Sequence, residues 1–416
     1  MKLQLAIQGV GGYADLMFRR TLDARLRRLA GQFPAFFLTG PRQSGKTTLA
    51  KTVFPTHAYV NLEDPSTRGH ALEDPRGFLA HHRGGVILDE VQRAPDLLSY
   101  IQVLVDQDPT PGRYVLTGSQ QLPLTRSVSQ TLAGRAAVCV LLPLSLSEFT
   151  GVQAGDPWLP DEPEDAGRSA PPGMALDEVL YQGLFPRIHD RNLDAADWLG
   201  FYYTTYVERD VRDLGGVGNL DSFRRFVQLC AGRSGQLLNL SSLGSDCGIS
   251  HTTASAWISV LQALFVVHLL PPHHRNFAKR VIKSPKLYFL DTGLLCNLLR
   301  IREPSQIALH ANRGAIFETF VVAEYFKEFT HRGIRSPLYF WRDRTGHEVD
   351  LLIDDGTRLL PVEMKAGLTL SGGLYDGLDW FCARGVPASR HGVLVYGGDE
   401  WGVRRGHLTR PWHACI

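Results

Sequence analysis

The chain has 416 residues, which is too long for one ordinary core, so roughly two to four domains are expected. Its 44% hydrophobic and 21% charged residues and its formal net charge of +2 are typical of globular proteins, and any nucleic-acid surface must be a local patch. Six scattered cysteines without CxxC spacing and the lack of a long apolar run predict a cytoplasmic protein without zinc, disulfides or a membrane partner.

The first part of the chain is predicted to contain a parallel sheet. Residues 1–16 lack a proper signal-peptide core and are expected to form a loose extension. From 17 to 152, short apolar runs alternate with helical patterns, as in βαβ units. The predicted strands are continuously hydrophobic, which favours a parallel sheet buried on both faces. They span 35–40, 57–63, 84–90, 113–119 and 136–145.

A phosphate-binding loop follows the first predicted strand. The segment GPRQSGKTT fits the pattern G-x-x-x-x-G-K-[ST] between a strand and a helix. Glycines let backbone N–H groups curl around phosphates, the lysine reaches the β- and γ-phosphates, and the threonine supplies a hydroxyl to Mg²⁺. ATP and Mg²⁺ are therefore the expected cofactors. The predicted nucleotide-binding residues are Gly40, Pro41, Arg42, Gln43, Ser44, Gly45, Lys46, Thr47 and Thr48.

Polar residues beside later strands are expected to complete the catalytic site. Asp89 is predicted to hold Mg²⁺ with Thr47, and Glu90 to orient or deprotonate the attacking water. Ser119, at the end of the next strand, is placed to sense the γ-phosphate, although an ordinary polar loop explains it equally well. Arg135 is either an arginine finger offered to a neighbouring subunit of a homo-oligomer or a salt-bridged surface residue.

The middle of the chain is predicted to be helical. Residues 153–173 are rich in Pro, Asp, Glu and Gly, which indicates a linker or exposed insertion, and a helical, lid-like segment follows at 174–215. From 216 to 300 we expect a winged helix-turn-helix, with the second helix capped by Ser250 or Thr252.

The wing of this module is basic. DNA-phosphate contacts are predicted for Arg275, Lys279, Arg280, Lys283 and Lys286. The alternative is a packing or protein-docking module, because the expected recognition helix carries little positive charge.

Within the last region, 301–416, the segment GHEVDLLIDDGTRLLPVEMKAG is predicted to form a β-hairpin that turns at Asp355 and Gly356. In that register Glu348 lies opposite Glu363. Facing carboxylates destabilise an ordinary sheet, whereas Mg²⁺ or Mn²⁺ would make use of them. The expected core face carries Val349, Leu351, Ile353, Leu360, Val362 and Met364, and the other face carries Glu348, Asp350, Glu363 and Lys365.

Several segments resemble the prokaryotic AAA-type ATPases that carry a C-terminal domain of uncharacterised function. The ATPase part is similar in GPRQSGKTTL, NLEDP, VILDEVQRAPDLLSYIQ, LTGSQ, LAGR and PLSLSEF, and the C-terminal part in TYVERDVRDL, LYFLDTGLL and the hairpin. The segment QGLFPR departs slightly from the usual pattern, with Phe185 at the aromatic place. The resemblance implies an AAA+ module, a winged-helix segment and a terminal domain related to the PD-(D/E)XK nuclease fold.

The hairpin also fits the D…E-x-K spacing of that nuclease superfamily. Asp350, Glu363 and Lys365 carry the match, and Glu318 on the preceding helix is a possible further acid. The alternative is a solvent-exposed Glu–Lys face in a domain without catalysis.

The predicted fold is therefore α/β and multidomain: a P-loop parallel-sheet AAA+ module, a helical and winged-helix middle and a restriction-endonuclease-like α/β C-terminal domain. The predicted function is ATP hydrolysis coupled to action on nucleic acid or a protein partner. The alternatives are an ATP-regulated, metal-dependent endonuclease and a nucleotide-switched DNA-binding or scaffold protein.

Overall fold

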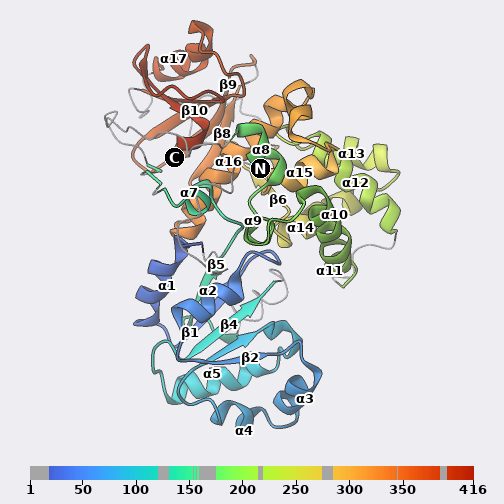
Figure 1. Cartoon of the computed structure of the whole chain (residues 1–416), viewed down its shortest axis with the longest axis vertical. Coiled ribbons are helices and arrows are strands. Elements are labelled where there is room, and N and C mark those ends of the chain that lie inside the picture. Colours follow the sequence, from blue (N-terminus) through green and yellow to red (C-terminus); the bar gives the residue numbers. More distant parts are fainter. Residues whose placement is uncertain are drawn as a thin grey trace.

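A computed structural model of the chain describes residues 18–119, 131–152, 154–155, 157–158, 175–213, 219–273, 284–343, 345–384 and 391–416. The predicted N-terminal extension and most of the predicted linker at 153–173 lie outside these residues. Figure 1 shows an elongated molecule, with the N-terminal sheet and its helices in the lower part and the remaining elements in a broader upper part.

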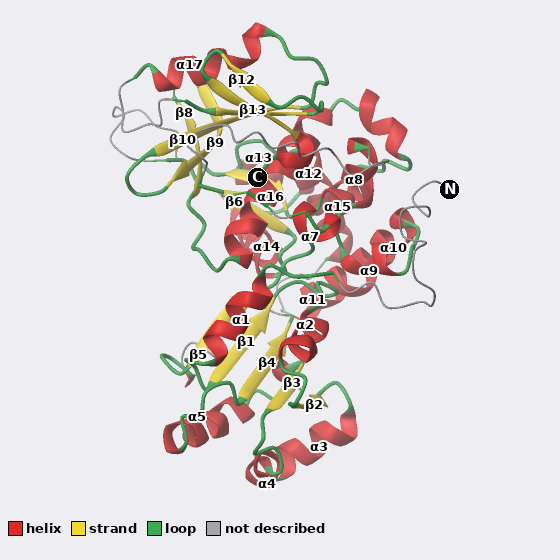
Figure 2. Cartoon of the chain, turned by 60° about the vertical axis from the view of Figure 1, so that its left-hand side comes forward, coloured by secondary structure: helices red, strands yellow, loops and turns green. Residues whose placement is uncertain are grey.

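The N-terminal sheet is parallel, as predicted. Its strands lie in the order β2-β3-β4-β1-β5, and every neighbouring pair is parallel. The strands are β1 (Ala35–Thr39), β2 (Ala58–Asn61), β3 (Val86–Asp89), β4 (Tyr114–Gly118) and β5 (Ala136–Val140). Because parallel strands share one direction, all of them end at the same edge of the sheet, where the P-loop begins (Figure 2).

Alternate side chains of β1 enter two separate cores. Phe36 and Leu38 pack with α1 (Leu22–Ala30) and α2 (Lys46–Val53), whereas Phe37 lies in the core that includes α5 (Leu97–Gln107). This two-sided burial explains the continuous hydrophobicity of the strands. Three further helical segments belong to the same module: α3 (Pro65–Glu73), α4 (Pro75–Ala80) and η2 (Val91–Arg93).

Short helices dominate the middle of the chain. They are α7 (Leu146–Thr150), α8 (Leu176–Gln182), α9 (Pro186–Asp190), α10 (Ala195–Tyr202), the π-helix η3 (Tyr203–Val207), α11 (Glu208–Asp213), α12 (Leu220–Gly232), α13 (Leu240–Cys247) and α14 (His251–Ala263). Strands β6 (Val267–Leu270) and β7 (Lys286–Phe289) follow and pair antiparallel, and then come α15 (Thr292–Leu298) and η4 (Pro304–Leu309).

Helices α13 and α14 occupy the positions predicted for a helix-turn-helix. Gly248 ends α13 with a φ of 68°, and the Ser250 side chain caps α14 by accepting a hydrogen bond from the Thr253 N–H. A winged-helix class and a role in DNA binding remain predictions. Most of the expected wing, residues 274–283, lies outside the described residues.

The C-terminal region combines a mixed sheet with one helix on each face. The strand order is β12-β13-β11-β10-β9-β8. Helix α16 (Arg313–His331) shares a core with one face, and α17 (Asp376–Cys382) packs on the other. The remaining elements are β8 (Leu338–Arg342), β9 (Glu348–Asp354), β10 (Leu359–Lys365), η5 (Gly372–Tyr375), β11 (Val393–Tyr396), β12 (Gly402–Arg404), β13 (His407–Pro411) and η6 (Trp412–Ala414).

The hairpin β9–β10 exists, but its predicted register was wrong by two residues. Asp354 pairs with Leu359 rather than with Thr357, and the loop spans residues 355–358. The Asp355 carboxylate accepts hydrogen bonds from the Thr357 and Arg358 N–H groups, which stabilises this longer turn. Glu348 is therefore not paired with Glu363.

The assignment of Val349 to the same face as Leu351 was also wrong. Val349 packs with Leu352 and α17, whereas Leu351 packs with α16. The cause is an irregularity in the pairing of β8 with β9, where the register shifts next to Asp350. The Asp350 carboxylate there accepts a hydrogen bond from the Met364 N–H at 3.0 Å.

One apolar core joins the middle helices to the C-terminal sheet. It includes Leu180 of α8, Phe226 of α12, Phe317 of α16 and Val362 of β10. Helix α16 lies between the two groups of elements (Figure 1). Within the described ranges, the structure has no helix whose length and apolarity would allow it to cross a membrane.

A close backbone contact fixes α15 against the end of α8. A Cβ atom on Gly293 would lie 2.6 Å from the Gln182 carbonyl oxygen and 2.7 Å from the Gly183 nitrogen. Asp291 caps α15 by accepting from the Leu294 N–H and also accepts from the Leu184 N–H at 2.8 Å. These contacts account for Asp291 and Gly293 in the segment LDTGLL. They also fix the position of the segment that leads into α9.

Gly293→Ala should therefore destabilise the protein by about 1–3 kcal/mol, because neither backbone can retreat without disturbing the packed core. Gly314→Ala in α16 is the matched control, since nothing lies within 4 Å of the added Cβ. It should be neutral or stabilising by less than about 1 kcal/mol. Urea denaturation followed by circular dichroism measures both, and equal midpoints would contradict the steric explanation.

Candidate nucleotide site

The predicted P-loop connects β1 to α2 with the expected local geometry. Gly40 and Gly45 have φ values of 148° and 94°, and α2 begins at Lys46. A Cβ on Gly40 would lie 2.0 Å from the Leu141 carbonyl oxygen, so glycine is required there for two reasons. The loop therefore presents a helix N-terminus, the element that attracts phosphate, at the edge of the sheet.

Lys46 is buried beneath the loop. Its ammonium donates hydrogen bonds to the carbonyl oxygens of Gly40 and Pro41 at 3.0 and 2.7 Å. Burial lowers the pKa of Lys46 to about 8, because desolvation penalises the charged form. An anion placed in the loop would favour the charged form and reverse this shift.

Thr47 and Asp89 meet as predicted for a magnesium site. The Thr47 hydroxyl donates to Asp89 Oδ2 at 2.9 Å, and Tyr59 donates to the same oxygen at 2.8 Å. Thr117 donates to the other oxygen of this buried carboxylate. A hydroxyl and a carboxylate side by side are hard oxygen donors, so this pair fits Mg²⁺.

Glu90 follows Asp89 in a left-handed conformation with a φ of 58°, which is uncommon for a residue with a side chain. Its carboxylate accepts a hydrogen bond from Gln92, and Ser119 Oγ lies 3.4 Å from Glu90 Oε2. Ser119 thus lies beside Glu90, and its predicted role in sensing the γ-phosphate stays a prediction. The contact of Gln92 with Glu90 was not predicted.

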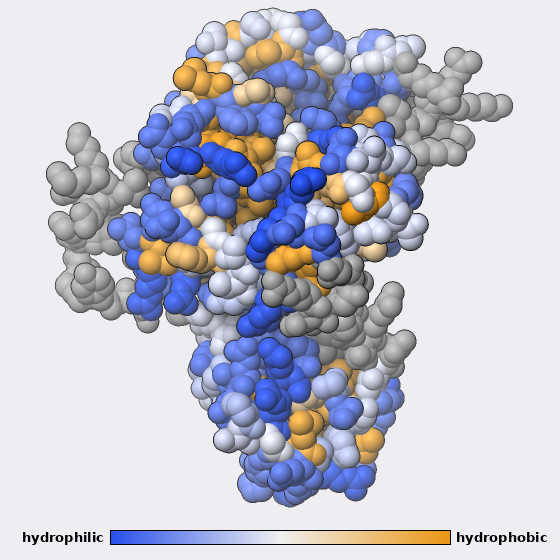
Figure 3. Space-filling view, turned by 90° about the vertical axis from the view of Figure 1, so that its right-hand side faces the viewer, coloured by the Kyte–Doolittle hydropathy of each residue, from blue (hydrophilic) through white to orange (hydrophobic). Residues whose placement is uncertain are grey.

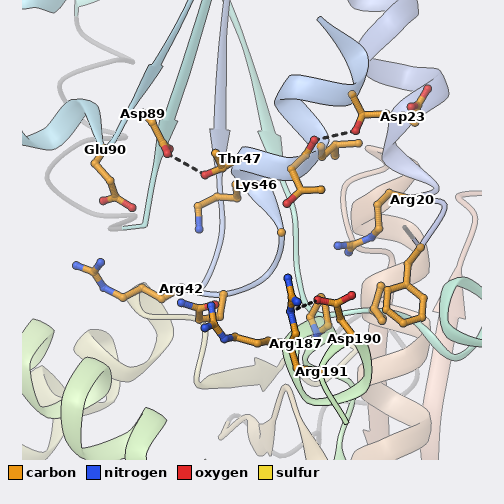
Figure 4. Close-up of a pocket in the computed structure, with 18 of the residues that line it drawn as sticks. Arg20, Asp23, Arg42, Lys46, Thr47, Asp89, Glu90, Arg187, Asp190 and Arg191 are labelled. Carbon is orange, nitrogen blue, oxygen red and sulfur yellow. Dashed lines mark hydrogen bonds and ion pairs between the residues drawn. The ribbon is translucent and has the colours of Figure 1, made fainter. Parts of the chain in front are cut away.

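A cavity of about 1230 Å³ lies in front of these residues. Its near wall contains Lys46, Thr47, Asp89 and Glu90 (Figure 4). The opposite wall comes from the middle helices and carries six residues that sequence reasoning did not assign to the site: Pro186, Arg187, Asp190, Arg191, Tyr206 and Arg209. In Figure 4, Arg187 and Arg191 lie on the side of the cavity away from Asp89. This wall could not be inferred from local motifs because about 140 residues separate it from the P-loop.

Arg42 links the P-loop directly to the middle helices. Its guanidinium donates to both oxygens of Asp210 at 2.8 and 3.1 Å, and it lies over the Tyr206 ring. Gln43 also lies within 3.4 Å of the Tyr206 hydroxyl. The side chains of Arg42 and Asp210 are 10% and 4% exposed, so the ion pair is shielded from water.

Arg135 lies apart from this cavity. It precedes β5, and its guanidinium pairs with Asp106 of α5 at 2.5 Å. The described residues that line the cavity do not include it. An arginine finger acting on a second subunit therefore stays a prediction, and the surface salt bridge is the contact that the chain itself provides.

The predicted C-terminal acids do converge in space. The Lys286 ammonium lies 2.9 Å from Glu318 and 2.5 Å from Glu348, and Tyr288 donates to Glu318. Lys365 contacts Glu363 at 2.5 Å and lies 3.8 Å from Asp350. These residues come from four elements: β7, α16, β9 and β10.

Burial, and next the charge of Asp350, raise the pKa of Glu363 to about 7. Glu363 Oε2 is buried without a hydrogen-bond partner. Within the part of the chain that the structure describes, however, no three His, Cys, Asp or Glu side chains are grouped to hold a metal ion. Lysine ammonium groups lie between the carboxylates instead.

Lys286 is not available as the predicted DNA contact. Its side chain is buried, because the two carboxylates attract its charge into the protein. The other predicted contacts, Arg275, Lys279, Arg280 and Lys283, lie outside the described residues.

Comparison with family models identifies three matching segments. Residues 32–150 match an AAA domain, residues 174–305 match a domain of unknown function (DUF8612), and residues 313–410 match a second domain of unknown function (DUF4143). The first match contains β1 to β5 and the P-loop, the second contains Arg187 and Asp210, and the third contains α16 and the hairpin.

Two solved structures show low overall similarity to this chain. The Walker-type ATPase PABY2304 of Pyrococcus abyssi has 13% identity and a TM-score of 0.43, covering 68% of this chain and 96% of its own. RuvB of Thermotoga maritima has 15% identity and a TM-score of 0.27, covering 60% and 89%.

Three relatives are closer in sequence. The uncharacterised protein Rv2008c of Mycobacterium tuberculosis is 34% identical over 361 residues, which span 86% of this chain and 76% of the relative. Its Mycobacterium bovis counterpart, Mb2031c, gives the same values, and MJ1544 of Methanocaldococcus jannaschii is 21% identical over 333 residues, or 76% and 70% of the two chains. The chain therefore belongs to the same family as these mycobacterial proteins, and its own residues 32–150 match an AAA domain.

Proposed function

We propose that this protein binds ATP with Mg²⁺ and hydrolyses it. One observation carries the proposal: Lys46 and Thr47, at the start of α2, and Asp89 and Glu90, at the end of β3, face a single large cavity. The AAA-domain match over the same residues supports ATP as the ligand.

Each residue has a role that follows from its position. The P-loop N–H groups and the Lys46 ammonium bind the phosphates, and Glu90 orients the attacking water and accepts its proton. Thr47 and Asp89 would hold Mg²⁺, which supplies positive charge beside the phosphate oxygens. Ser119 and Gln92 contact Glu90 and hold its carboxylate toward the cavity.

Hydrolysis is proposed to act on the middle helices. Arg187, Arg191 and Arg209 place positive charge opposite the P-loop, and Asp190 on the same wall pairs with Arg191 at 3.1 Å. Bound phosphates can attract these arginines, and loss of the phosphates can release them. The energy is proposed to serve a nucleic-acid or protein partner. The face that carries α12 and α13 is mainly hydrophilic, with apolar side chains in separate patches (Figure 3).

A metal-dependent endonuclease is a second candidate activity. The convergence of Glu318, Glu348, Asp350 and Glu363 with Lys365 favours it. Hard cations prefer such carboxylates, although Mg²⁺ or Mn²⁺ would have to compete with the Lys286 ammonium. A non-catalytic DNA-binding or scaffold role is the outcome if neither activity is found.

Phosphate-release and binding assays test the ATPase. Lys46→Ala should weaken binding of a fluorescent ATP analogue by about 10- to 100-fold, because a charged hydrogen-bond donor is lost. Glu90→Gln should keep binding and lower kcat by about 100-fold or more, because a general base is removed. Tight binding by the wild-type protein without phosphate release would contradict hydrolysis and favour a nucleotide switch.

ATP affinity should depend on pH through Lys46. Its pKa of about 8 means that the lysine loses its proton above that pH, and phosphate binding must then restore it. Kd should be flat from about pH 6.5 to 7.5 and rise about tenfold per unit above pH 8. Lys46→Arg stays charged, so a similar rise in this variant would exclude Lys46 as the cause.

Incubation with Mn²⁺ and supercoiled DNA tests the endonuclease. Asp350→Asn should lower cleavage by about 100-fold or more, since a metal ligand is lost, while ATP turnover persists. Asp354→Asn, at the other end of β9, is the matched control and should cleave normally. Absence of cleavage by the wild-type protein would reject this candidate.

A further inference from the structure

A buried arginine ahead of α1 connects the P-loop to the rest of the protein. Arg20 Nη1 donates to the Ser44 carbonyl oxygen at 2.7 Å, Nη2 to the Leu142 carbonyl oxygen at 2.7 Å, and Nε to Glu148 Oε2 at 3.0 Å. Its side chain is 6% exposed. Arg20 also lines the cavity, but each of its three side-chain nitrogens donates to a protein acceptor, and its proposed effect on a nucleotide is through the loop that it holds.

The contact with Ser44 fixes the orientation of one peptide unit of the P-loop. In a trans peptide the carbonyl oxygen and the next N–H point in opposite directions. Holding the Ser44 oxygen against Arg20 therefore directs the Gly45 N–H away from Arg20. Gly45, with its φ of 94°, stands immediately before α2, where phosphate-binding N–H groups are needed.

Glu148 of α7 holds the arginine in place. Its carboxylate also accepts hydrogen bonds from the Thr21 N–H at 2.7 Å and the Ser145 N–H at 3.1 Å. Although burial opposes it, the adjacent His331 side chain and the charge of Arg20 hold the pKa of Glu148 well below its usual range. The carboxylate is therefore ionised, and both of its oxygens accept hydrogen bonds from the protein.

His331, at the end of α16, completes the connection. Its Nε2 accepts a hydrogen bond from the Leu142 N–H at 3.1 Å, so its proton is on Nδ1, which lies 3.2 Å from Glu148 Oε1. Helix α16 makes two more contacts with this segment: Glu324 accepts from the Leu146 N–H at 2.6 Å, and Lys327 donates to the Leu144 carbonyl oxygen at 2.9 Å.

We propose that Arg20 is a positioning residue of the nucleotide site, and that Glu148 and His331 hold it so that the C-terminal region sets the conformation of the P-loop. The inference rests on the proposed ATP binding and deepens it. The nucleotide site is then incomplete without α16, although α16 lies outside the AAA-domain segment at 32–150.

Steady-state kinetics of Arg20→Lys in the full-length chain test this role. Lysine keeps the charge opposite Glu148 but cannot reach three acceptors as the planar guanidinium does. KM for ATP and Kd for a fluorescent ATP analogue should rise about tenfold or more, because a loop N–H that binds phosphate loses its orientation. The kcat should change less than about threefold, since bound and transition states lose the same contact.

Arg25→Lys is the matched control. Arg25 lies on α1 and donates to the carbonyl oxygen of Arg332, the residue that follows α16, at 3.1 Å, but it does not contact the P-loop. Its KM should match the wild type. Equal KM values for Arg20→Lys, Arg25→Lys and the wild type would overturn the inference and leave the ATPase intact, whereas a wild type that binds no nucleotide would overturn both.

A second variant addresses the effect of Arg20→Lys on folding. Glu148→Gln leaves Arg20 in place and removes the charge that holds it, so it should raise KM in the same direction. In the double variant the two effects should be less than additive, because both residues act through one contact. Full additivity, or an unchanged KM in a folded Glu148→Gln protein, would contradict the proposed connection.

Discussion

The parallel pairing of β1, β3 and β4 is the constraint on which the site depends. Because the three strands run in one direction, the P-loop, Asp89, Glu90 and Ser119 all leave the sheet at one edge. A reversal of any one strand would place its polar residues at the far end of the module. Two-sided burial of these strands keeps their order fixed, so the geometry of the candidate site is a consequence of core packing.

Charged contacts make up much of the junction between the sheet module and the rest of the chain. The module has two apolar cores of its own, and the middle and C-terminal regions share another. Between them lie Arg42 with Asp210 and Arg20 with Glu148, together with a small apolar cluster of Leu142, Phe265 and Leu290. Buried ion pairs contribute little net stability but are costly to break singly, so such a junction favours a few defined arrangements.

Local patterns were sufficient for the parts of the site that are close in sequence. The P-loop, the β3 acids and the cap at Ser250 follow from spacing and residue type alone, because their partners lie within a few residues. The hairpin register failed because the Asp355 carboxylate, rather than the Asp355-Gly356 pair, determines the turn. Sequence patterns assigned Lys286 wrongly and missed Arg187 and Arg20. The reason is that the groups these residues face are far away along the chain.

The π-helix η3 makes the length of the α10–α11 segment significant. A π-turn holds one more residue than an α-turn, so it rotates everything that follows relative to what precedes it. Tyr202 packs in the core, whereas Tyr206 and Asp210 reach the P-loop. An α-helix advances about 100° per residue, so deleting one residue of η3 would turn Asp210 to a different face and leave Arg42 without its carboxylate. The number of residues between α10 and α11 thus sets the direction in which Asp210 points. The contact between the N-terminal sheet module and the middle helices depends on that number.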